Sequence, residues 1–319
     1  MNMKRKINTA SETINGRSAL VVSGLGDMDI TDTLECGQAF RYEELCRKDG
    51  YVEYLTVAMG KLIFIGQRSR DELIFYGMSE DDIPMLDGYF GLTVDYTAIR
   101  EMISGAIDSE WMMRAADSGK GIHILKQDAW EALFSFIISQ NNNIPRIRKI
   151  IRRLAVEYGE NLAIRDGIAT CPKGLCQGVD SEICRGCGIC YSFPTAEAVA
   201  GEPEKMLVAN PGFRYKYLLD AAKRVNEGRT DLKKIEGRES FEEIITELKE
   251  ILGVGDKVAS CVALFGMGRL EAFPIDVWMK RAIDEYFDGS LDYGKFGEWA
   301  GIAQQYIFHY IRNIGEKNS

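Results

Sequence analysis

Residues 252–276 read LGVGDKVASCVALFGMGRLEAFPID, and this stretch decides how the rest of the chain is organised. A glycine turn precedes a run with the apolar spacing of a helix. Glycine permits positive φ and close approach of the backbone. The N-terminus of a helix presents free N–H groups and favours an anion. The stretch therefore predicts a tight turn followed by a helix, with a phosphate-binding site at Gly253, Val254 and Gly255.

Two chemically reactive residues accompany this turn. Lys257 falls in the first turn of the predicted helix, and Asp276 precedes a further helical run that it could cap. A neutral lysine amine is a nucleophile, and a carboxylate stabilises positive charge that develops beside it. The chain has only two histidines, His123 and His309, so no histidine-based zinc hydrolase motif or Ser-His-Asp triad can be assembled convincingly. These observations favour lysine and carboxylate chemistry.

The stretch LGVGDKVASC, followed by FPIDVWMKR, resembles the helix-hairpin-helix glycosylases with a Gly-Pro-Asp signature, and within them the 8-oxoguanine DNA glycosylase/lyases. The resemblance covers nearly the whole chain. It implies an α+β fold, with a TBP-like N-terminal twisted antiparallel β-sheet domain followed by an all-α helix-hairpin-helix glycosylase domain, whose hairpin lies near residues 245–266. It also implies that Lys257 attacks C1′ of a flipped 8-oxoguanosine and forms a Schiff base, after which β-elimination nicks the strand. Asp276 would stay ionised and stabilise the sugar.

Periodicity divides the chain into a strand-rich and a helical part. We expect residues 1–17 to be flexible, 18–120 to form the sheet domain and 121–319 the helical region. Short runs rich in β-formers predict strands at 51–57 and 61–66, joined by a tight turn at Met59-Gly60. Apolar spacing predicts helices over 95–107 and 128–140, and a last helix over 292–314.

The family resemblance extends to residues 34–42, LECGQAFRY. It implies that the Gly37 carbonyl accepts a hydrogen bond from N7–H of the oxidised base, which ordinary guanine lacks. It further implies that Cys261 and Phe308 pack against the base and that Gln304 contacts its Watson–Crick edge. From the residues alone, Gly37 is equally a turn glycine, and Cys261 is equally a small apolar residue on a helix.

Residues 134–147, FSFIISQNNNIPRI, match another stretch of the family. The resemblance implies that Asn141 fills the gap left by the extruded base and that Arg146 reads the orphaned cytosine, which offsets part of the cost of flipping. A glycine-aromatic-arginine stretch implies that Phe213 wedges beside the orphan base while Arg214 contacts it. Without the family, the three asparagines are a cap and turn, and Phe213 is a core aromatic.

The net charge of −9 argues mildly against a nucleic-acid partner, but the charges are unevenly distributed. Residues 144–153 carry five basic side chains and no acid. Like-charge pairs four residues apart, Arg148 with Arg152 and Lys149 with Arg153, are mildly destabilising in an isolated helix. They suggest an anionic neighbour, although a solvated helix face is the alternative for the last two residues. The expected partner is double-stranded DNA that contains 8-oxoguanine, bound by a monomer.

Five of the eight cysteines fall in a Gly- and Pro-containing segment, residues 168–192. Four thiolates from this set could bind zinc or an iron–sulfur cluster in a structural role, whereas reduced thiols or a disulfide are the alternatives. Catalysis by lysine requires no cofactor. This segment is a departure from the family pattern. The candidate metal ligands in it are Cys171, Cys176, Cys184, Cys187 and Cys190.

No apolar run reaches the length of a membrane span, and no apolar stretch follows the basic start, so we expect a cytoplasmic protein. Two other functions stay open. One is a glycosylase/lyase for another oxidised base, and the other is a non-catalytic helix-hairpin-helix DNA-binding protein. A lesion panel separates the first from 8-oxoguanine excision. Salt-dependent binding without base release would identify the second.

Overall fold

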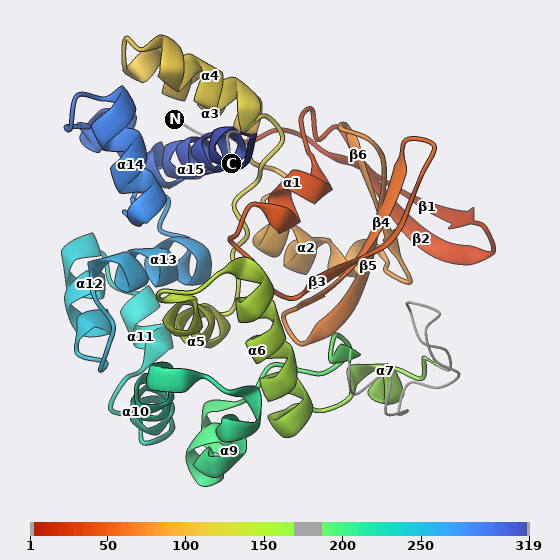
Figure 1. Cartoon of the computed structure of the whole chain (residues 1–319). Helices are drawn as coiled ribbons and strands as arrows, with labels where there is room; N and C mark the ends of the chain where they lie inside the picture. The colour runs from red at the N-terminus through yellow and green to blue at the C-terminus, as the bar shows by residue number, and fades with distance from the viewer. Residues whose placement is uncertain (1–2, 169–186, 318–319) are drawn as a thin grey trace.

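The computed structural model describes residues 3–168 and 187–317. Figure 1 shows a twisted sheet on one side of the molecule and a body of helices on the other. The sheet has six strands in the order β1-β2-β6-β5-β4-β3, and every neighbouring pair is antiparallel. The strands are β1 (Asn8–Ile14), β2 (Arg17–Ser23), β3 (Tyr42–Lys48), β4 (Tyr51–Ala58), β5 (Lys61–Ser69) and β6 (Glu72–Tyr76).

The N-terminus differs from the prediction. Residues 8–14 were expected to be flexible, but they form β1, which pairs along its whole length with β2. Six of its seven residues are exposed, so the strand lacks the apolar alternation by which half-buried strands are recognised. Backbone pairing at the sheet edge, rather than side-chain burial, therefore holds this segment.

Helices cover one face of the sheet. Figure 1 shows α1 (Ile30–Glu35) and α2 (Ile83–Phe90) against it. Strand residues alternate between the two faces: Tyr54 packs in the core beneath these helices, whereas Leu55 belongs to a smaller cluster on the other face with Leu162 and Ile189. The expected turn at Met59-Gly60 is confirmed, since Ala58 pairs with Lys61 and both turn residues have positive φ.

The helical body follows the sheet and includes four 3₁₀ helices, labelled η, among the described elements. No described helix has the length and apolar character needed to cross a membrane. In addition to α1 and α2, the helices are η1 (Glu80–Asp82), α3 (Tyr96–Ala106), α4 (Glu110–Ser118), α5 (Ala129–Ser139), α6 (Ile144–Tyr158), α7 (Leu162–Arg165), α9 (Ala196–Gly201), η2 (Pro203–Ala209), η3 (Gly212–Arg214), α10 (Tyr215–Asn226), α11 (Leu232–Glu236), α12 (Phe241–Lys249), α13 (Asp256–Met267), α14 (Val277–Tyr286), η4 (Tyr293–Trp299) and α15 (Ala300–Lys317).

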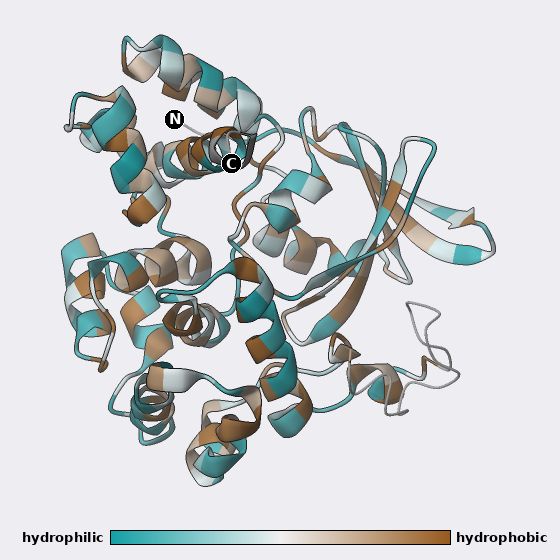
Figure 2. Ribbon diagram, in the orientation of Figure 1, coloured by the Kyte–Doolittle hydropathy of each residue, from teal (hydrophilic) through white to brown (hydrophobic). Residues whose placement is uncertain are grey.

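Helix α5 lies at the centre of the body. Asp128 caps it by accepting a hydrogen bond from the Glu131 N–H, and residues 132–138 are all buried. A helix that is apolar on all sides is expected in the interior, and Figure 2 shows α5 largely brown. It packs chiefly against α13, where Gly266 allows close approach because a side chain there would collide with Ala132. The glycine-turn element thus rests directly on the core.

The core of the sheet layer includes Leu92 and also Leu125, whereas Ile99 on α3 and Met112 on α4 belong to the core of the helical body. The boundary expected at residue 120 stays a prediction. Both helices have strong amphipathic patterns, but periodicity does not say which layer an apolar face will contact. Here α4 packs against α15, and the N- and C-terminal parts of the chain therefore share one core.

The last helix also differs from the prediction. A single helix was expected over 292–314, but η4 comes first and is interrupted at Gly297, with φ 54° and ψ −132°. Helix α15 then begins at Ala300. Gly301 lies where a side chain would approach the carbonyls of Leu270 and Ala272 at 2.9 Å, so the start of α15 can pack closely on the chain that leads to α14.

Candidate active site

The predicted helix-hairpin-helix is present as α12, a glycine turn and α13. Gly253 has φ 81° and lies against the Tyr217 ring, where a Cβ would be 2.4 Å from a ring carbon. Gly255 precedes α13 without a side-chain cap and faces open space. Val254 differs from the prediction for the phosphate site, because its side chain is buried and its N–H donates to the Ile251 carbonyl. The open N-terminus of α13 remains the part of the hairpin suited to an anion.

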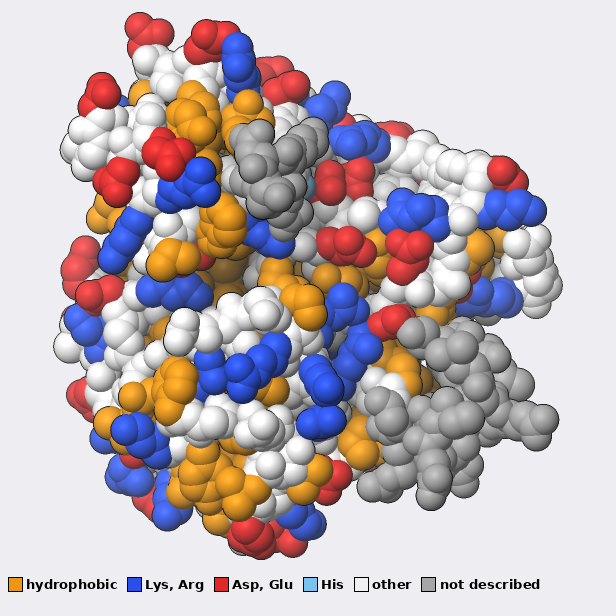
Figure 3. Space-filling model, in the orientation of Figure 1, with side chains coloured by type: hydrophobic (Ala, Val, Ile, Leu, Met, Phe, Trp, Pro, Cys, Tyr) orange, Lys and Arg blue, Asp and Glu red, His pale blue; other side chains and the backbone are white. Residues whose placement is uncertain are grey.

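The start of α13 opens onto a cleft of about 1100 Å³ between the helices and the loop before β3. Figure 3 shows a hollow on this face and Lys and Arg side chains along α6 beside it. The cleft brings together predicted residues from distant parts of the sequence. Those on its wall are Gly37, Asn141, Gly255, Lys257, Asp276 and Phe308.

The Lys257 side chain is held over the end of α5. Its Nζ donates to Ser139 Oγ at 3.2 Å and lies 5.2 Å from the centre of the Phe136 ring. Ser139 in turn donates to the Phe136 carbonyl. Asp276 caps α14 as predicted, accepting from the Met279 N–H at 2.9 Å through Oδ1. This bond fixes the position of the Asp276 carboxyl group at the start of α14.

The expected base-binding residues divide into two groups. Gly37, with φ 91°, and Phe308 face each other, since a Cβ on Gly37 would lie 3.4 Å from the Phe308 ring. Cys261 and Gln304 lie behind the cleft wall and are almost fully buried. Burial raises the pKa of the Cys261 thiol, while the charge of Lys257 opposes that shift. Cys261 is therefore a neutral thiol beside the lysine.

Gln304 carries an unsatisfied polar atom. Its side chain is 5% exposed, and within the described residues its Oε1 has no hydrogen-bond partner. A buried acceptor without a donor costs about 1–3 kcal/mol. Gln304 lies one helical turn before Phe308 on α15, so its amide is close to the side chain that faces Gly37. The position suits a ligand that supplies a donor.

Arg214 does not have the surface position expected of a base-contacting residue. It is 2% exposed, and its guanidinium donates to backbone carbonyls: Nε to Gln140 at 2.9 Å, and one terminal nitrogen to both Gln140 and Asn141. Burial, followed by the nearby charge of Arg146, lowers the pKa of Arg214. These bonds hold the turn that contains Asn141, whose φ of 48° is unusual for a residue other than glycine.

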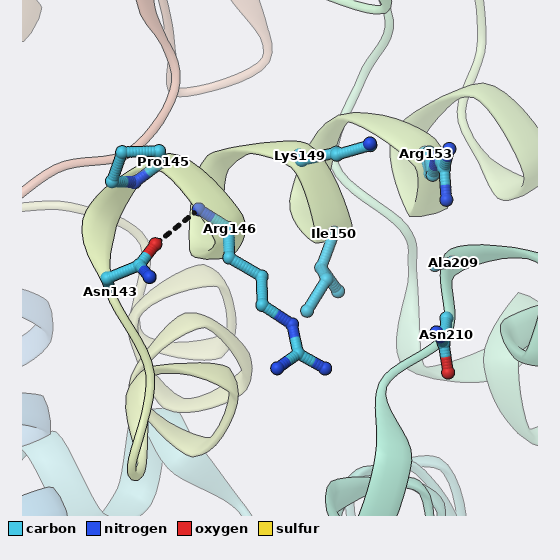
Figure 4. A pocket seen from close by; sticks show the side chains of 8 residues that line it. All are labelled: Asn143, Pro145, Arg146, Lys149, Ile150, Arg153, Ala209 and Asn210. Carbon is cyan, nitrogen blue, oxygen red and sulfur yellow. Dashed lines mark hydrogen bonds between the residues drawn. The ribbon is translucent and has the colours of Figure 1, made fainter.

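Arg146 and Phe213 lie at the surface near this turn. Asn143 caps α6 by accepting from the Arg146 N–H at 3.0 Å, and Figure 4 shows the Arg146 side chain extending from α6 into an adjacent pocket. Phe213 is 50% exposed and packs edge-on against Tyr217. Both side chains are exposed, and the contacts expected of them around an extruded base stay predictions.

Comparison with known proteins assigns the family. Residues 21–133 match the family model described as 8-oxoguanine DNA glycosylase, N-terminal domain. A solved structure described as MBOgg1 in complex with a low-affinity DNA ligand is 34% identical to this chain. Its TM-score is 0.80, over 98% of this chain and 100% of that one. The chain belongs to the 8-oxoguanine DNA glycosylase family. The α+β fold expected from the resemblance is thereby confirmed.

Two further relatives of this 8-oxoguanine DNA glycosylase support the same family assignment. A structure of the Clostridium acetobutylicum 8-oxoguanine glycosylase/lyase, with double-stranded DNA containing cytosine opposite 8-oxoguanine, is 30% identical. It has a TM-score of 0.80 and covers 98% of this chain and 99% of that one. A Saccharomyces cerevisiae protein named N-glycosylase/DNA lyase is 25% identical over 80% of this chain and 67% of its own length.

Some residues of the cleft carried no signal in the sequence. Ser139 was part of a run interpreted as a buried helix, and nothing in its spacing indicated a bond to Lys257. Lys280 lies exposed on the cleft wall one turn after Asp276. Helical spacing from Asp276 would have placed Lys280 on the same side of α14, so this residue could have been found.

The cysteine-rich segment lies mostly outside the described residues. Cys171, Cys176 and Cys184 fall in this part. Cys187 is half-buried and Cys190 is buried, and both pack with the cluster on the outer face of the sheet. Among the described residues, no group of three or more His, Cys, Asp or Glu side chains could hold a metal ion.

Proposed function

We propose that this protein is a bifunctional DNA glycosylase/AP lyase that flips 8-oxoguanine out of duplex DNA, where it is paired with cytosine, and excises it. The observation that carries the proposal is the cleft, in which Lys257 and Asp276 lie with Gly37 and Phe308. A nucleophile and an anion on one wall, with a carbonyl and an aromatic ring on another, suit a base and its sugar bound together.

Recognition of the oxidised base rests on Gly37. Its carbonyl accepts a hydrogen bond from N7–H of 8-oxoguanine, whereas guanine presents an acceptor at N7. Glycine is favoured here because of its positive φ, while a Cβ would lie in ordinary contact with the Phe308 ring. Phe308 stacks on the base, and such stacking does not distinguish one purine from another. The Gln304 amide turns to the Watson–Crick edge of the base, whose donors satisfy its Oε1.

Lys257 performs the chemistry. Its neutral amine attacks C1′, a C1′–N bond to lysine forms, and the bond from C1′ to N9 breaks. The departing base takes the electron pair and then a proton. The C1′–O4′ bond of the sugar ring then breaks and O4′ takes a proton, while the amine loses its protons and the Schiff base forms. Loss of a C2′ proton then expels the 3′ phosphate and cuts the strand. The carboxylate of Asp276 stabilises the positive charge on the sugar, and its cap bond to the Met279 N–H holds it in place.

The DNA around the vacated base is held by the turn between α5 and α6. Asn141 fills the gap in the helix and Arg146 donates to the orphaned cytosine, while Phe213 wedges beside it. Arg146 and Phe213 are exposed, as such contacts require. Arg214 supports them from below through the carbonyls of Gln140 and Asn141. The relative from C. acetobutylicum, which is described with cytosine opposite 8-oxoguanine, supports this choice of opposite base.

A panel of lesions and opposite bases tests the proposal. We expect release of 8-oxoguanine and a nicked strand from a duplex with cytosine opposite, slower release with adenine opposite, and no release of guanine. Preferred release of an oxidised pyrimidine would contradict the substrate assignment. Binding that depends on salt without any base release would contradict the assignment of an enzyme.

A further inference from the structure

Helix α6 presents three different sides, set by the roughly 100° turn per residue of an α-helix. Its apolar residues face the core, and they include Ile147, Ile150, Ile151 and Leu154. Arg148 and Arg152, about 200–240° around the helix from Arg146, face the sheet. The exposed residues Arg146, Lys149 and Arg153 fall within about 60° of one another. We call these three residues the α6 basic row.

The two sets of basic residues on α6 have different partners. Arg148 and Arg152 both donate to the Tyr42 carbonyl and pair with the Glu43 carboxylate. The anionic neighbour suggested by the sequence is therefore real for this pair and belongs to the protein itself. In contrast, no carboxylate among the described residues forms an ion pair with any member of the α6 basic row.

The α6 basic row lines a pocket of its own, distinct from the cleft. The pocket has a volume of about 400 Å³ and lies between α6 and the segment after η2. Figure 4 shows the Arg146 guanidinium extending into it, Lys149 and Arg153 further along α6, and Asn210 on the opposite side. Asn210 is exposed and adds an amide donor. Donors and positive charges thus meet from two elements.

This arrangement costs energy in the free protein. Arg146 and Lys149 are three residues apart, and Lys149 and Arg153 are four apart, so each pair repels by about 0.2–0.5 kcal/mol. A bound anion would relieve both repulsions. The row is also long: Arg146 and Arg153 are separated by a rise of about 10.5 Å, which exceeds the 3.4 Å axial spacing of nucleotides in a DNA strand. One small anion would not contact all three side chains.

We propose that Lys149, Arg153 and Asn210 form a binding site for the backbone phosphates of the DNA strand opposite the lesion. The proposal rests on the proposed function, in which Arg146 contacts the orphaned cytosine on that strand. From Arg146, the α6 basic row leads away from Lys257, which acts on the other strand. Phosphates next to the orphaned cytosine would then reach Lys149 and Arg153, and the contacts would fix the register of the duplex.

The test measures how the affinity of the full-length protein for a duplex with one 8-oxoguanine·cytosine pair depends on salt. The variant is Lys149→Gln with Arg153→Gln. Each phosphate contact contributes a slope of about −0.9 to log K against log salt, so the slope should become shallower by about 2. At about 150 mM salt, binding should weaken roughly 10-fold or more.

A matched control removes two exposed lysines elsewhere, Lys233→Gln with Lys234→Gln on α11. Lys233 lies near the N-terminus of α5, whereas the cleft is at its C-terminus, and the change in net charge is the same. We expect near wild-type affinity and slope for the control. If both double variants change the slope equally, the effect is one of net charge, and the proposed site is wrong. Equal melting temperatures would show that all three proteins are folded.

Neutral methylphosphonate linkages identify the strand. Placed beside the orphaned cytosine, they should weaken binding by the wild-type protein and have little further effect on the Lys149→Gln, Arg153→Gln variant. If only linkages in the lesion strand show this coupling, the strand assignment is wrong. These measurements report binding and do not depend on release of the base or cutting of the strand. A failure to release base would contradict the proposed function, while the salt slopes and the linkages would still decide the phosphate site.

Discussion

At the scale of single residues, Arg214 shows how a side chain can act on DNA through the backbone. Its planar guanidinium contacts the carbonyls of Gln140, Asn141 and Pro211. Asn141 has φ 48°, a conformation that costs about 1–3 kcal/mol and persists when surrounding bonds enforce it. Arg214 therefore holds the backbone of Asn141, which the proposed function places in the duplex.

Replacement of Arg214 by lysine tests this role. Arg214→Lys keeps the charge but cannot reproduce the fork of donors. We expect a loss of about 1–3 kcal/mol in stability and a fall of about 10-fold in the preference for cytosine over adenine opposite the lesion, because the Asn141 turn is no longer fixed. The preference is measured as a ratio of single-turnover rates.

The matched control is Arg224→Lys on α10, where the arginine pairs with Asp220 away from the turn. It should keep the wild-type ratio. An Arg214→Lys variant with the wild-type ratio, even if less stable, would show that Arg214 has only a structural role.

The sequence identified the residues of the cleft better than their contacts. Lys257, Asp276 and Asn141 stand in recognisable motifs, and their placement follows from caps and turns that are local. The bonds of Arg214 to the Gln140 and Asn141 carbonyls join η3 to the turn after α5. Such contacts depend on how two distant elements pack, which residue type and spacing do not specify.

At the scale of elements, the loop that carries Gly37 is fixed by Gln38. This side chain is fully buried. Its Nε2 donates to the carbonyls of Thr33 and His123, and its Oε1 accepts from the Leu125 N–H. The Gln38 carbonyl accepts from Gln127 at 2.7 Å. These hydrogen bonds join residues 123–127, which lead into α5, to the loop before β3 that contains Gly37.

We predict that Gln38→Met lowers the free energy of unfolding by about 3 kcal/mol, since three buried hydrogen bonds are lost at about 1 kcal/mol each and their partners stay unsatisfied. It should also reduce discrimination between 8-oxoguanine and guanine, because Gly37 moves. Chemical denaturation and binding to matched duplexes measure the two effects.

Gln305→Met provides the comparison. Gln305 is also buried, and among the described residues its Nε2 donates to the Cys36 carbonyl at 3.0 Å. We expect Gln305→Met to lower the free energy of unfolding by about 1 kcal/mol. If Gln38→Met costs no more than Gln305→Met, the network around Gln38 does not fix the loop.

Local signals located most elements correctly. The predicted hairpin at Met59-Gly60 and the helices near 95–107 and 128–140 agree with the structure. Strand β1 was missed because NTASETI has no apolar alternation. The kink at Gly297 was missed because a glycine inside a periodic run is compatible with a continuous helix, and only the packing of Gly301 against Leu270 and Ala272 selects the break.

At the scale of the whole molecule, the cleft lies where two cores meet. The loop with Gly37 comes from the sheet side, whereas Lys257, Asp276 and Phe308 come from the helical body. The boundary expected at residue 120 stays a prediction, since α3 and α4 follow the sheet in sequence but belong to the core of the helical body, where α4 packs with α15. The net charge of −9 likewise hides a basic row on α6. Sums over the chain do not report where charges or apolar faces lie.

The most direct test of the central claim is borohydride trapping of the Schiff base on a duplex with 8-oxoguanine opposite cytosine. Lys257→Gln is compared with Lys280→Gln, which removes another lysine of the same cleft. We predict a covalent protein–DNA complex with the wild-type protein and with Lys280→Gln, attached at Lys257 when the adduct is mapped by mass spectrometry, and none with Lys257→Gln. Full trapping by Lys257→Gln would contradict the account.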